Sequence, residues 1–265
     1  MTDPHPAHPP PRRSRRPPAR RVRVIGTEPL TPHMQRVTLG GDGLDGFHTG
    51  SPASYVKLYL PAPGQADLVL PTFGPKGPEY PDGATRPVQR TYTPRNFDPR
   101  RNELDIDVVL HGAGVASDWA AGARPGDPAG VAGPGSGWDP DADAPWFVLV
   151  GDESALPAIA TITEALPEGR TLNVIVEIPT DSDRIDLTSP AVLITSWLVR
   201  GEGQPGAALE DAVRGLHLPV GDGHFWVATE SAVVRRIRDH LVADRGLDRS
   251  RYTIRAYWKA GEAGT

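Results

Sequence analysis

Two different hydrophobic rhythms meet near residue 145, and this change constrains the fold more than any other feature of the chain. From residue 21 to about residue 144, apolar and polar residues alternate in short runs, clearest at residues 21–27, 35–39, 55–60 and 103–110. Gly and Pro separate these runs, and strict alternation is typical of strands with one buried face. With only one short helical stretch, the pattern predicts a small antiparallel Greek-key β-barrel.

Beyond residue 145, strand and helix patterns alternate. Strand patterns occupy residues 146–150, 172–178, 191–199, 225–228 and 252–258. Helical patterns occupy residues 155–166 and 231–245, and the second is expected to place Val234, Ile237, Leu241 and Val242 on one face. Such alternation is typical of a parallel sheet with right-handed crossovers. Because residues 139–145 are rich in Asp, Pro and Ala, we expect a barrel domain at 19–144 and an α/β domain at 145–265.

Composition restricts the class of protein. Residues 1–18 are almost entirely Pro, Arg, His and small polar residues, which cannot offset the entropy of ordering and predict a disordered tail. The chain has 0 Cys, which excludes disulfides, cysteine-ligated iron–sulfur clusters and thiol catalysis. A net charge of -5 does not favour nucleic-acid binding, and no apolar run is long enough to span a membrane. We expect a cytoplasmic monomer. We expect no metal site, because the histidines lack the spacing of metal ligands.

Three chemically distinct side chains stand close together in residues 90–95, Arg-Thr-Tyr-Thr-Pro-Arg. The guanidinium of Arg90 can donate two hydrogen bonds to a phosphate. The ring of Tyr92 offers a flat surface to a heterocycle, and the hydroxyl of Thr93 can bind its polar edge. These groups suit a flavin dinucleotide. An ordinary β-strand is an equally good interpretation of this hexapeptide taken alone.

A Gly-rich turn at residues 112–117, Gly-Ala-Gly-Val-Ala-Ser, follows a strand and opens a helix. It is not a Rossmann turn, because no second strand ending in an acid follows about twenty residues later. A helix N-terminus still presents free amides to a phosphate, here those of Ala116 and Ser117. A plain helix cap by Ser117 is the alternative interpretation.

A second polar turn, Gly-Asp-Glu-Ser at residues 151–154, lies where a strand ends and a helix begins, with Ser154 as the expected cap. Ligands bind at the carboxyl ends of strands in open α/β sheets. We therefore expect at least one of Asp152, Glu153 and Glu230 to contact a ligand, although two carboxylates in the turn would repel a permanently bound pyrophosphate. The alternative is that the three carboxylates only balance helix dipoles.

Taken in order, these motifs resemble the siderophore-interacting protein family, flavin-dependent ferric-siderophore reductases of the ferredoxin–NADP reductase-like superfamily. The resemblance covers residues 21 to 261. It rests on residues 30–34 (Leu-Thr-Pro-His-Met), 55–58 (Tyr-Val-Lys-Leu), 90–93 (Arg-Thr-Tyr-Thr), 109–112 (Val-Leu-His-Gly), 151–158 (Gly-Asp-Glu-Ser-Ala-Leu-Pro-Ala) and 257–259 (Tyr-Trp-Lys). It implies a barrel that binds FAD, followed by an α/β half that binds NADPH or NADH and interacts with the siderophore.

The resemblance also implies residue roles. A nicotinamide, binding transiently, would contact Asp152, Glu153, Ser154, Ala155 and Glu230. Arg90, Thr91, Tyr92 and Thr93 would contact FAD, with Tyr92 and Thr93 at the reacting ring; Asp107, Val109 and His111 would line the cofactor, with Ala116 and Ser117 at its pyrophosphate. The sequence departs from the family at Pro94, where Val is common, and at Thr229, which brings more bulk to the expected cofactor approach than the usual Gly.

The activity implied is hydride transfer from NAD(P)H to flavin, followed by one-electron reduction of a ferric siderophore. Hard oxygen donors hold Fe(III) more strongly than Fe(II), so reduction releases the metal. Anionic chelates favour a cationic approach, for which Lys57, Arg200, Arg255 and Lys259 are candidates, although three Lys in all do not match the lysine cluster of part of the family. Two alternatives remain, an organic acceptor or a non-catalytic siderophore carrier. Arg235, Arg236 and Arg238 could bind the 2′-phosphate of NADPH or simply lie on the surface of a helix. The sequence therefore leaves the choice between NADH and NADPH open.

Overall fold

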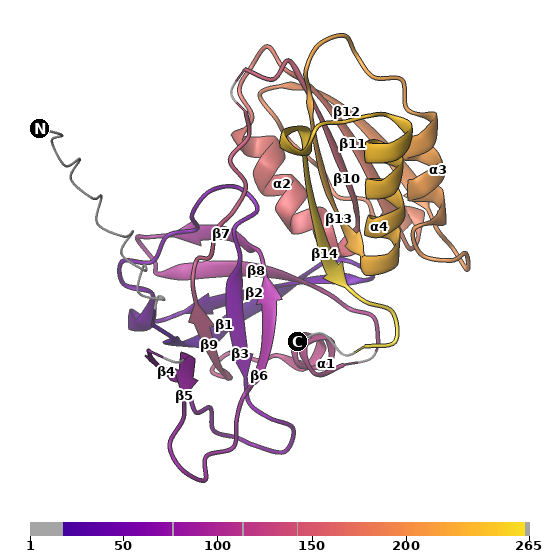
Figure 1. Ribbon diagram of the computed structural model, residues 1–265. Coiled ribbons are helices and arrows are strands. Elements are labelled where there is room, and N and C mark those ends of the chain that lie inside the picture. Colours follow the sequence, from indigo (N-terminus) through magenta and orange to yellow (C-terminus); the bar gives the residue numbers. More distant parts are fainter. Residues whose placement is uncertain (1–17, 76, 113, 142, 263–265) are drawn as a thin grey trace, which may run out of the picture.

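The computed structural model describes residues 18–262, except residues 76, 113 and 142. The predicted tail, residues 1–18, lies outside the described residues apart from its last member. The first half of the chain forms an antiparallel sheet and the second half a parallel sheet, and the two stand one above the other (Figure 1). This arrangement confirms the predicted β and α/β architecture.

The first sheet has seven strands in the order β6-β3-β9-β1-β2-β8-β7, and each neighbouring pair is antiparallel. They are β1 (Arg20–Thr31), β2 (Met34–Gly40), β3 (Val56–Leu60), β6 (Val88–Tyr92), β7 (Pro94–Asp98), β8 (Glu103–Val109) and β9 (Pro128–Ala132). A ribbon of β4 (Thr72–Gly74) and β5 (Gly77–Glu79), a 3-10 helix at Asp42–Leu44 and helix α1 (Val115–Gly122) complete this half. Inward residues such as Val37, Leu58, Ile106 and Val131 form its core.

Strands β6 and β7 are the opposite edges of this sheet, yet only Thr93 separates them in the chain. The sheet must therefore curl until its two edges meet at Thr93, which produces the barrel shape. Thr93 is 8% exposed. Pro94 begins an edge strand, where its missing N–H is tolerated. The motif at residues 90–95 thus lies at the seam of the barrel.

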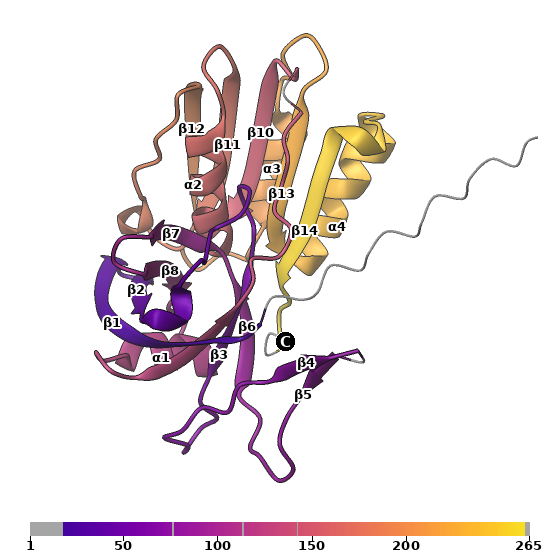
Figure 2. The ribbon, with the colours of Figure 1, turned by 90° about the vertical axis from the view of Figure 1, so that its left-hand side faces the viewer.

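The second sheet has the order β12-β11-β10-β13-β14, with parallel pairing throughout. Its strands are β10 (Trp146–Asp152), β11 (Thr171–Ile178), β12 (Val192–Val199), β13 (His224–Glu230) and β14 (Tyr252–Trp258). Helix α2 (Leu156–Ala165) packs on one face, whereas α3 (Ala207–Gly215) and α4 (Ser231–Asp239) pack on the other (Figure 2). Short 3-10 helices lie at Glu153–Ala155, Asp181–Asp183 and Arg249–Arg251.

The expected helix at residues 231–245 is only partly correct. Helix α4 ends at Asp239 and continues as a π-helical turn, His240–Asp244, in which the Arg245 N–H donates to the His240 carbonyl at 3.1 Å. This wider winding changes the phase of the helix. Val242 is consequently 44% exposed, whereas Leu241 remains buried, so the placement of Val242 on the buried face was wrong.

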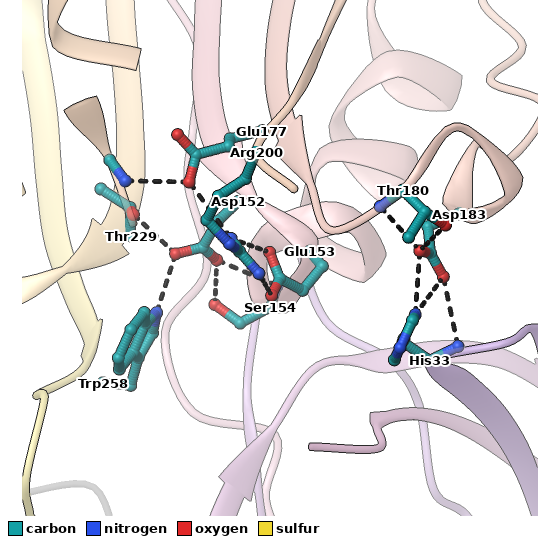
Figure 3. Close-up of polar contacts among 11 residues, drawn as sticks. His33, Asp152, Glu153, Ser154, Glu177, Thr180, Asp183, Arg200, Thr229 and Trp258 are labelled. Atoms are coloured by element: carbon teal, nitrogen blue, oxygen red, sulfur yellow. Dashed lines mark hydrogen bonds and ion pairs between the residues drawn. The ribbon is translucent and has the colours of Figure 1, made fainter. Parts of the chain in front are cut away.

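A buried carboxylate joins the two halves. Asp183 of the α/β half accepts from the backbone N–H of His33, in the β1–β2 turn, at 3.2 Å and contacts the His33 ring Nδ1 at 2.9 Å (Figure 3). The Thr180 hydroxyl donates to the same carboxylate at 2.7 Å. Burial works to raise the pKa of Asp183, but the hydrogen bonds from Thr180 and His33 outweigh it, and the pKa lies below its ordinary value.

This shift predicts a pH dependence of stability. A carboxyl whose pKa is depressed by folding stabilises the fold above its unfolded pKa, about 3.9, and loses that contribution as the pH falls through the lower folded value. The free energy of unfolding of the wild type should therefore exceed that of Asp183→Asn between pH 5 and 7. The difference should shrink as the pH drops below about 4. Urea denaturation across this range measures it, and a difference that grows in acid would contradict the assignment.

Candidate functional site

The seam residues divide between the two faces of β6. Register pairs Leu58 with Arg90 and Val56 with Tyr92, and alternate residues of a strand share a face, so Arg90 and Tyr92 project together. Burial raises the pKa of Tyr92 to about 12, against an opposing effect of Arg90. The Tyr92 hydroxyl therefore stays protonated at neutral pH.

Arg90 retains donors for an incoming anion. Its Nη1 donates to the carbonyl of Gln89 at 2.8 Å, the one hydrogen bond that its side chain forms with the residues that the structure describes. No carboxylate within the described ranges forms an ion pair with it. A partly buried guanidinium without a carboxylate partner is suited to phosphate oxygens.

The Gly-rich turn provides a helix N-terminus in the same half. Gly114 has a positive φ of 99 and is the N-cap of α1, whose first backbone bond runs from the Asp118 N–H to the Gly114 carbonyl at 3.0 Å. The amides of Ala116 and Ser117 precede that bond and have no partner within the helix. The alternative that Ser117 caps the helix was wrong. Its hydroxyl accepts from the His111 N–H at 3.1 Å and folds the loop back.

The residues expected to line the cofactor have different environments. Both oxygens of the buried Asp107 accept from Arg36, at 2.7 and 2.9 Å, so this carboxylate is engaged in a bidentate ion pair. Val109 is partly buried against the apolar cluster shared with the α/β half. His111 is exposed. Of these three, the side chain of Asp107 is thus already committed inside the barrel.

The α/β half meets the seam through its last strand. Tyr257 of β14 lies near Thr93, and burial raises the pKa of Tyr257 to about 12, opposed by Arg255 and by the Thr93 hydroxyl. The Tyr257 ring packs edge-on against Trp226, with centroids 6.1 Å apart. The end of the Arg-Thr-Tyr-Thr motif therefore faces the α/β half directly.

The connectivity of the parallel sheet identifies where a nucleotide would bind. The chain leaves β10 toward β11 on one side, whereas β13 and β14 lie on the other. Ligands bind in the crevice outside the carboxyl ends of strands at such a reversal of strand order. In this sheet the reversal lies between β10 and β13, whose last residues are Asp152 and Glu230.

Asp152 links three strands of this edge (Figure 3). Its carboxylate is 2% exposed and accepts from the Ser154 N–H at 2.9 Å, the Thr229 hydroxyl at 2.6 Å and the Trp258 indole N–H at 2.7 Å. Burial, then the nearby Glu153, raise its pKa despite these donors. Asp152, not Ser154, is the cap of the following turn, so the expectation that Ser154 caps the helix was wrong.

A second cluster lies at the neighbouring strand ends. Arg200, which follows β12, donates to both oxygens of Glu153, at 2.7 and 3.1 Å, and to Glu177 Oε1 at 3.1 Å. Glu177 is 0% exposed and also accepts from the Gly206 N–H at 2.8 Å. The hydrogen bonds that Arg200 donates to Glu153 raise the pKa of Arg200, and they outweigh burial, which lowers it. Arg200 is therefore not a free cation for an iron chelate.

Glu230 caps helix α4 and also binds the segment that follows β14. Its carboxylate accepts from the N–H groups of Val233 at 3.2 Å and Ala232 at 2.5 Å, and so begins α4. Its other oxygen accepts from the Ala260 N–H at 3.2 Å, after β14. Burial opposes ionisation, but the donors, led by Ala260 and Ala232, outweigh it and lower the pKa of Glu230. Ala155 is fully buried beside these strand ends.

The remaining cationic candidates are all engaged within the chain. Lys57 donates to the Thr91 hydroxyl at 2.7 Å, Arg255 donates to the Gly137 carbonyl at 3.0 Å, and Lys259 pairs with Glu262. Burial also lowers the pKa of Lys57. Of these three groups, only Lys259 is paired with a carboxylate, whereas Lys57 and Arg255 form no ion pair within the described part of the chain.

Several residues were missed by sequence reasoning. Thr229 was expected to crowd a cofactor, but it is 1% exposed and its hydroxyl points to Asp152. Trp258, Glu177 and the His33–Asp183 pair were given no such role. Each of these residues is a polar side chain at a strand end or in a tight turn. Such a position indicates a hydrogen bond only when the partner residue, which can be 150 residues away in the sequence, is known.

Comparison with known proteins identifies the family. Residues 23–138 match the model of the siderophore-interacting FAD-binding domain, and residues 144–261 match that of the siderophore-interacting protein. The ferric vibriobactin reductase of Vibrio cholerae is 34% identical over 88% of this chain and 86% of its own length. The chain belongs to the siderophore-interacting protein family. The match confirms the predicted family, and with it an FAD-binding reductase.

Two further members of this family support the assignment. The NADPH-dependent ferric-chelate reductase of Escherichia coli is 32% identical over 91% of this chain and 93% of its own length. The crystal structure of a siderophore utilization protein from T. fusca superimposes with a TM-score of 0.84 at 33% identity, covering 93% of this chain and 95% of that one. No helix in the part of the chain that the structure describes is long and apolar enough to cross a membrane.

The donor set of the barrel fits the cofactor of the family. FAD carries a pyrophosphate and a flat ring with a polar edge. Arg90 without a carboxylate partner and the free amides at the start of α1 suit the pyrophosphate. Tyr92 and Thr93, at the seam that faces the α/β half, suit the ring and its edge.

Proposed function

We propose that this chain transfers electrons from NADH or NADPH, through FAD, to a ferric siderophore and releases Fe(II). The observation that carries the proposal is the seam itself. Thr93 joins the two edges of the barrel, and its hydroxyl lies close enough to the Tyr257 phenol of the α/β half to affect its pKa. A cofactor held at the seam therefore faces the half expected to bind the nucleotide.

The residues of the barrel have distinct roles in this proposal. Arg90 and the amides of Ala116 and Ser117 bind the two phosphates, the ring of Tyr92 supports the flavin ring, and the Thr93 hydroxyl binds its polar edge. When bound, FAD supplies the conversion of a two-electron donation into single-electron transfers. The protein's part is to hold and orient both partners and to limit access of water.

The balance of electrons fixes the stoichiometry. Oxidation of one NADH or NADPH yields two electrons and releases one proton to the solvent. Each ferric complex takes one electron, so two ferric complexes are reduced for each nucleotide oxidised. Hard oxygen donors bind Fe(III) far more strongly than Fe(II). The reduced metal therefore leaves its chelator and can be trapped by a ligand that prefers Fe(II).

Anaerobic stopped-flow spectroscopy tests this proposal. FAD-loaded protein reduced with either nucleotide is mixed with a panel of ferric hydroxamate, catecholate and citrate complexes, with an Fe(II)-specific dye present. We expect flavin reoxidation and two Fe(II) per nucleotide. If neither nucleotide reduces the flavin, or if no ferric complex reoxidises it while an organic acceptor does, the proposal is wrong.

A further inference from the structure

The cluster of Glu153, Arg200 and Glu177 has a charge balance that bears on the choice of nucleotide. Arg200 is the one guanidinium in the cluster and its side chain is 14% exposed. Its donors are committed to three carboxylate oxygens at 2.7 to 3.1 Å. One positive charge thus faces two negative charges, and the cluster carries a net negative charge (Figure 3).

The carboxylate of Glu177 is held in a fixed position within this cluster. It is 0% exposed and sits on β11 opposite Asp152 of β10 and Leu198 of β12. Its Oε1 accepts from Arg200 and from the Gly206 N–H, whereas its Oε2 is buried without a recorded partner among the described residues. The Gly206 bond ties this carboxylate to the N-cap of α3. Glu177 therefore cannot move aside when an anion approaches.

The cluster lies at the end of β11, where sheets with this strand order bind the adenosine end of a dinucleotide, so Glu153 is placed beside the adenosine here and not beside the nicotinamide as first expected. Strand β11 is the second strand along the chain and neighbours β10 at the reversal of strand order. At the end of such a strand, an acid typically accepts from the ribose 2′-hydroxyl of NADH, whereas a nearby Arg binds the 2′-phosphate of NADPH. Here both residue types are present and are bonded to each other.

We infer that the Glu153–Arg200–Glu177 cluster makes this chain selective for NADH over NADPH. A 2′-phosphate brought to this edge meets a net negative cluster, whose guanidinium is already bound by two carboxylates. A ribose 2′-hydroxyl carries no charge and meets carboxylate acceptors. The loop after Arg200 adds Glu202, which is exposed. The inference rests on the proposed use of a pyridine nucleotide, and it goes beyond it by naming which one.

Two measurements on the FAD-loaded protein test the inference. The first is the ratio of kcat/KM for NADH and NADPH with one ferric chelate, expected to favour NADH by at least about tenfold, given charge repulsion at a partly buried site. The second is calorimetric titration with 5′-ADP and with 2′,5′-ADP, which represent the adenosine ends of the two nucleotides. We expect 5′-ADP to bind more tightly.

A charge-neutral variant sharpens the test. Glu177→Gln removes one negative charge and retains an oxygen for the Gly206 N–H, so the preference for NADH and for 5′-ADP should fall about fivefold or more. Glu153→Gln serves the same purpose at a more accessible position if the buried variant does not fold. Glu103→Gln is the matched control, because Glu103 also pairs with one arginine, Arg101, and its side chain is 21% exposed, but it lies on strand β8 of the barrel.

The outcomes separate this inference from the proposed function. Equal or greater efficiency with NADPH, or tighter binding of 2′,5′-ADP, would overturn the inference and leave the reductase assignment intact. Reduction by neither nucleotide would refute the reductase assignment, and the ADP titrations would still decide the selectivity of the site. Binding of neither ADP would also overturn the inference, as would an equal shift in Glu103→Gln.

Discussion

Replacing Arg90 by alanine should give a protein that purifies without its yellow colour. Arg90 is a guanidinium on the same strand face as Tyr92, and its one recorded hydrogen bond goes to a backbone carbonyl. Losing a bidentate bond to phosphate removes about 3 kcal/mol, which corresponds to a dissociation constant for FAD raised by about 100-fold. Titration of apoprotein with FAD, followed by quenching of flavin fluorescence, measures this change.

A matched control for this variant is Arg86→Ala. Arg86 lies four residues earlier, and its guanidinium stacks over the Tyr80 ring at 5.4 Å. Its removal should change FAD affinity by less than about threefold, the scale of a surface charge. Thermal unfolding of the two apoproteins should coincide. If Arg90→Ala retains FAD as tightly as the wild type, the phosphate role of Arg90 is wrong and the site must be sought elsewhere on the barrel.

Replacing Asp152 by alanine should destabilise the α/β half more than any surface change. The substitution leaves the buried Thr229 hydroxyl, the Trp258 indole N–H and the Ser154 amide without their shared acceptor. Each buried donor left unpaired costs about 1–3 kcal/mol, and we expect a total loss of about 3 kcal/mol because part of the structure relaxes. The free energy of unfolding from urea titration, followed by tryptophan fluorescence, reports it.

The control for this prediction is Asp181→Ala. Asp181 also forms an ion pair, with Arg184, but its side chain is 75% exposed. Exposed pairs contribute about 0–1 kcal/mol, so this variant should unfold almost as the wild type does. Comparable losses in both variants would show that the Asp152 hydrogen bonds contribute little. A loss confined to Asp152→Ala, accompanied by a raised KM for the nucleotide, would place this carboxylate at the nucleotide edge.

The sequence by itself determined the class of fold and pointed to the candidate flavin-binding residues. Alternation at residues 55–60 and 103–110 specifies half-buried strands, and the change of rhythm near residue 145 specifies a parallel sheet. These signals are local, because strand and helix periodicity depend on neighbours a few residues apart. Short strands that begin at Pro94 or Pro128, and the helix after Gly206, were missed because Pro and Gly usually mark turns.

Only the tertiary structure decided which polar groups are free and which are already bound. Arg90 lies in the middle of β6 and Arg200 directly follows β12, yet Arg90 has no carboxylate partner in the described chain and Arg200 has two. The difference arises because partners such as Glu153 and Arg200 are 47 residues apart and meet only when the sheet assembles. Charge, hydrogen-bonding capacity and burial are properties of that assembly, and residue identity alone does not specify them.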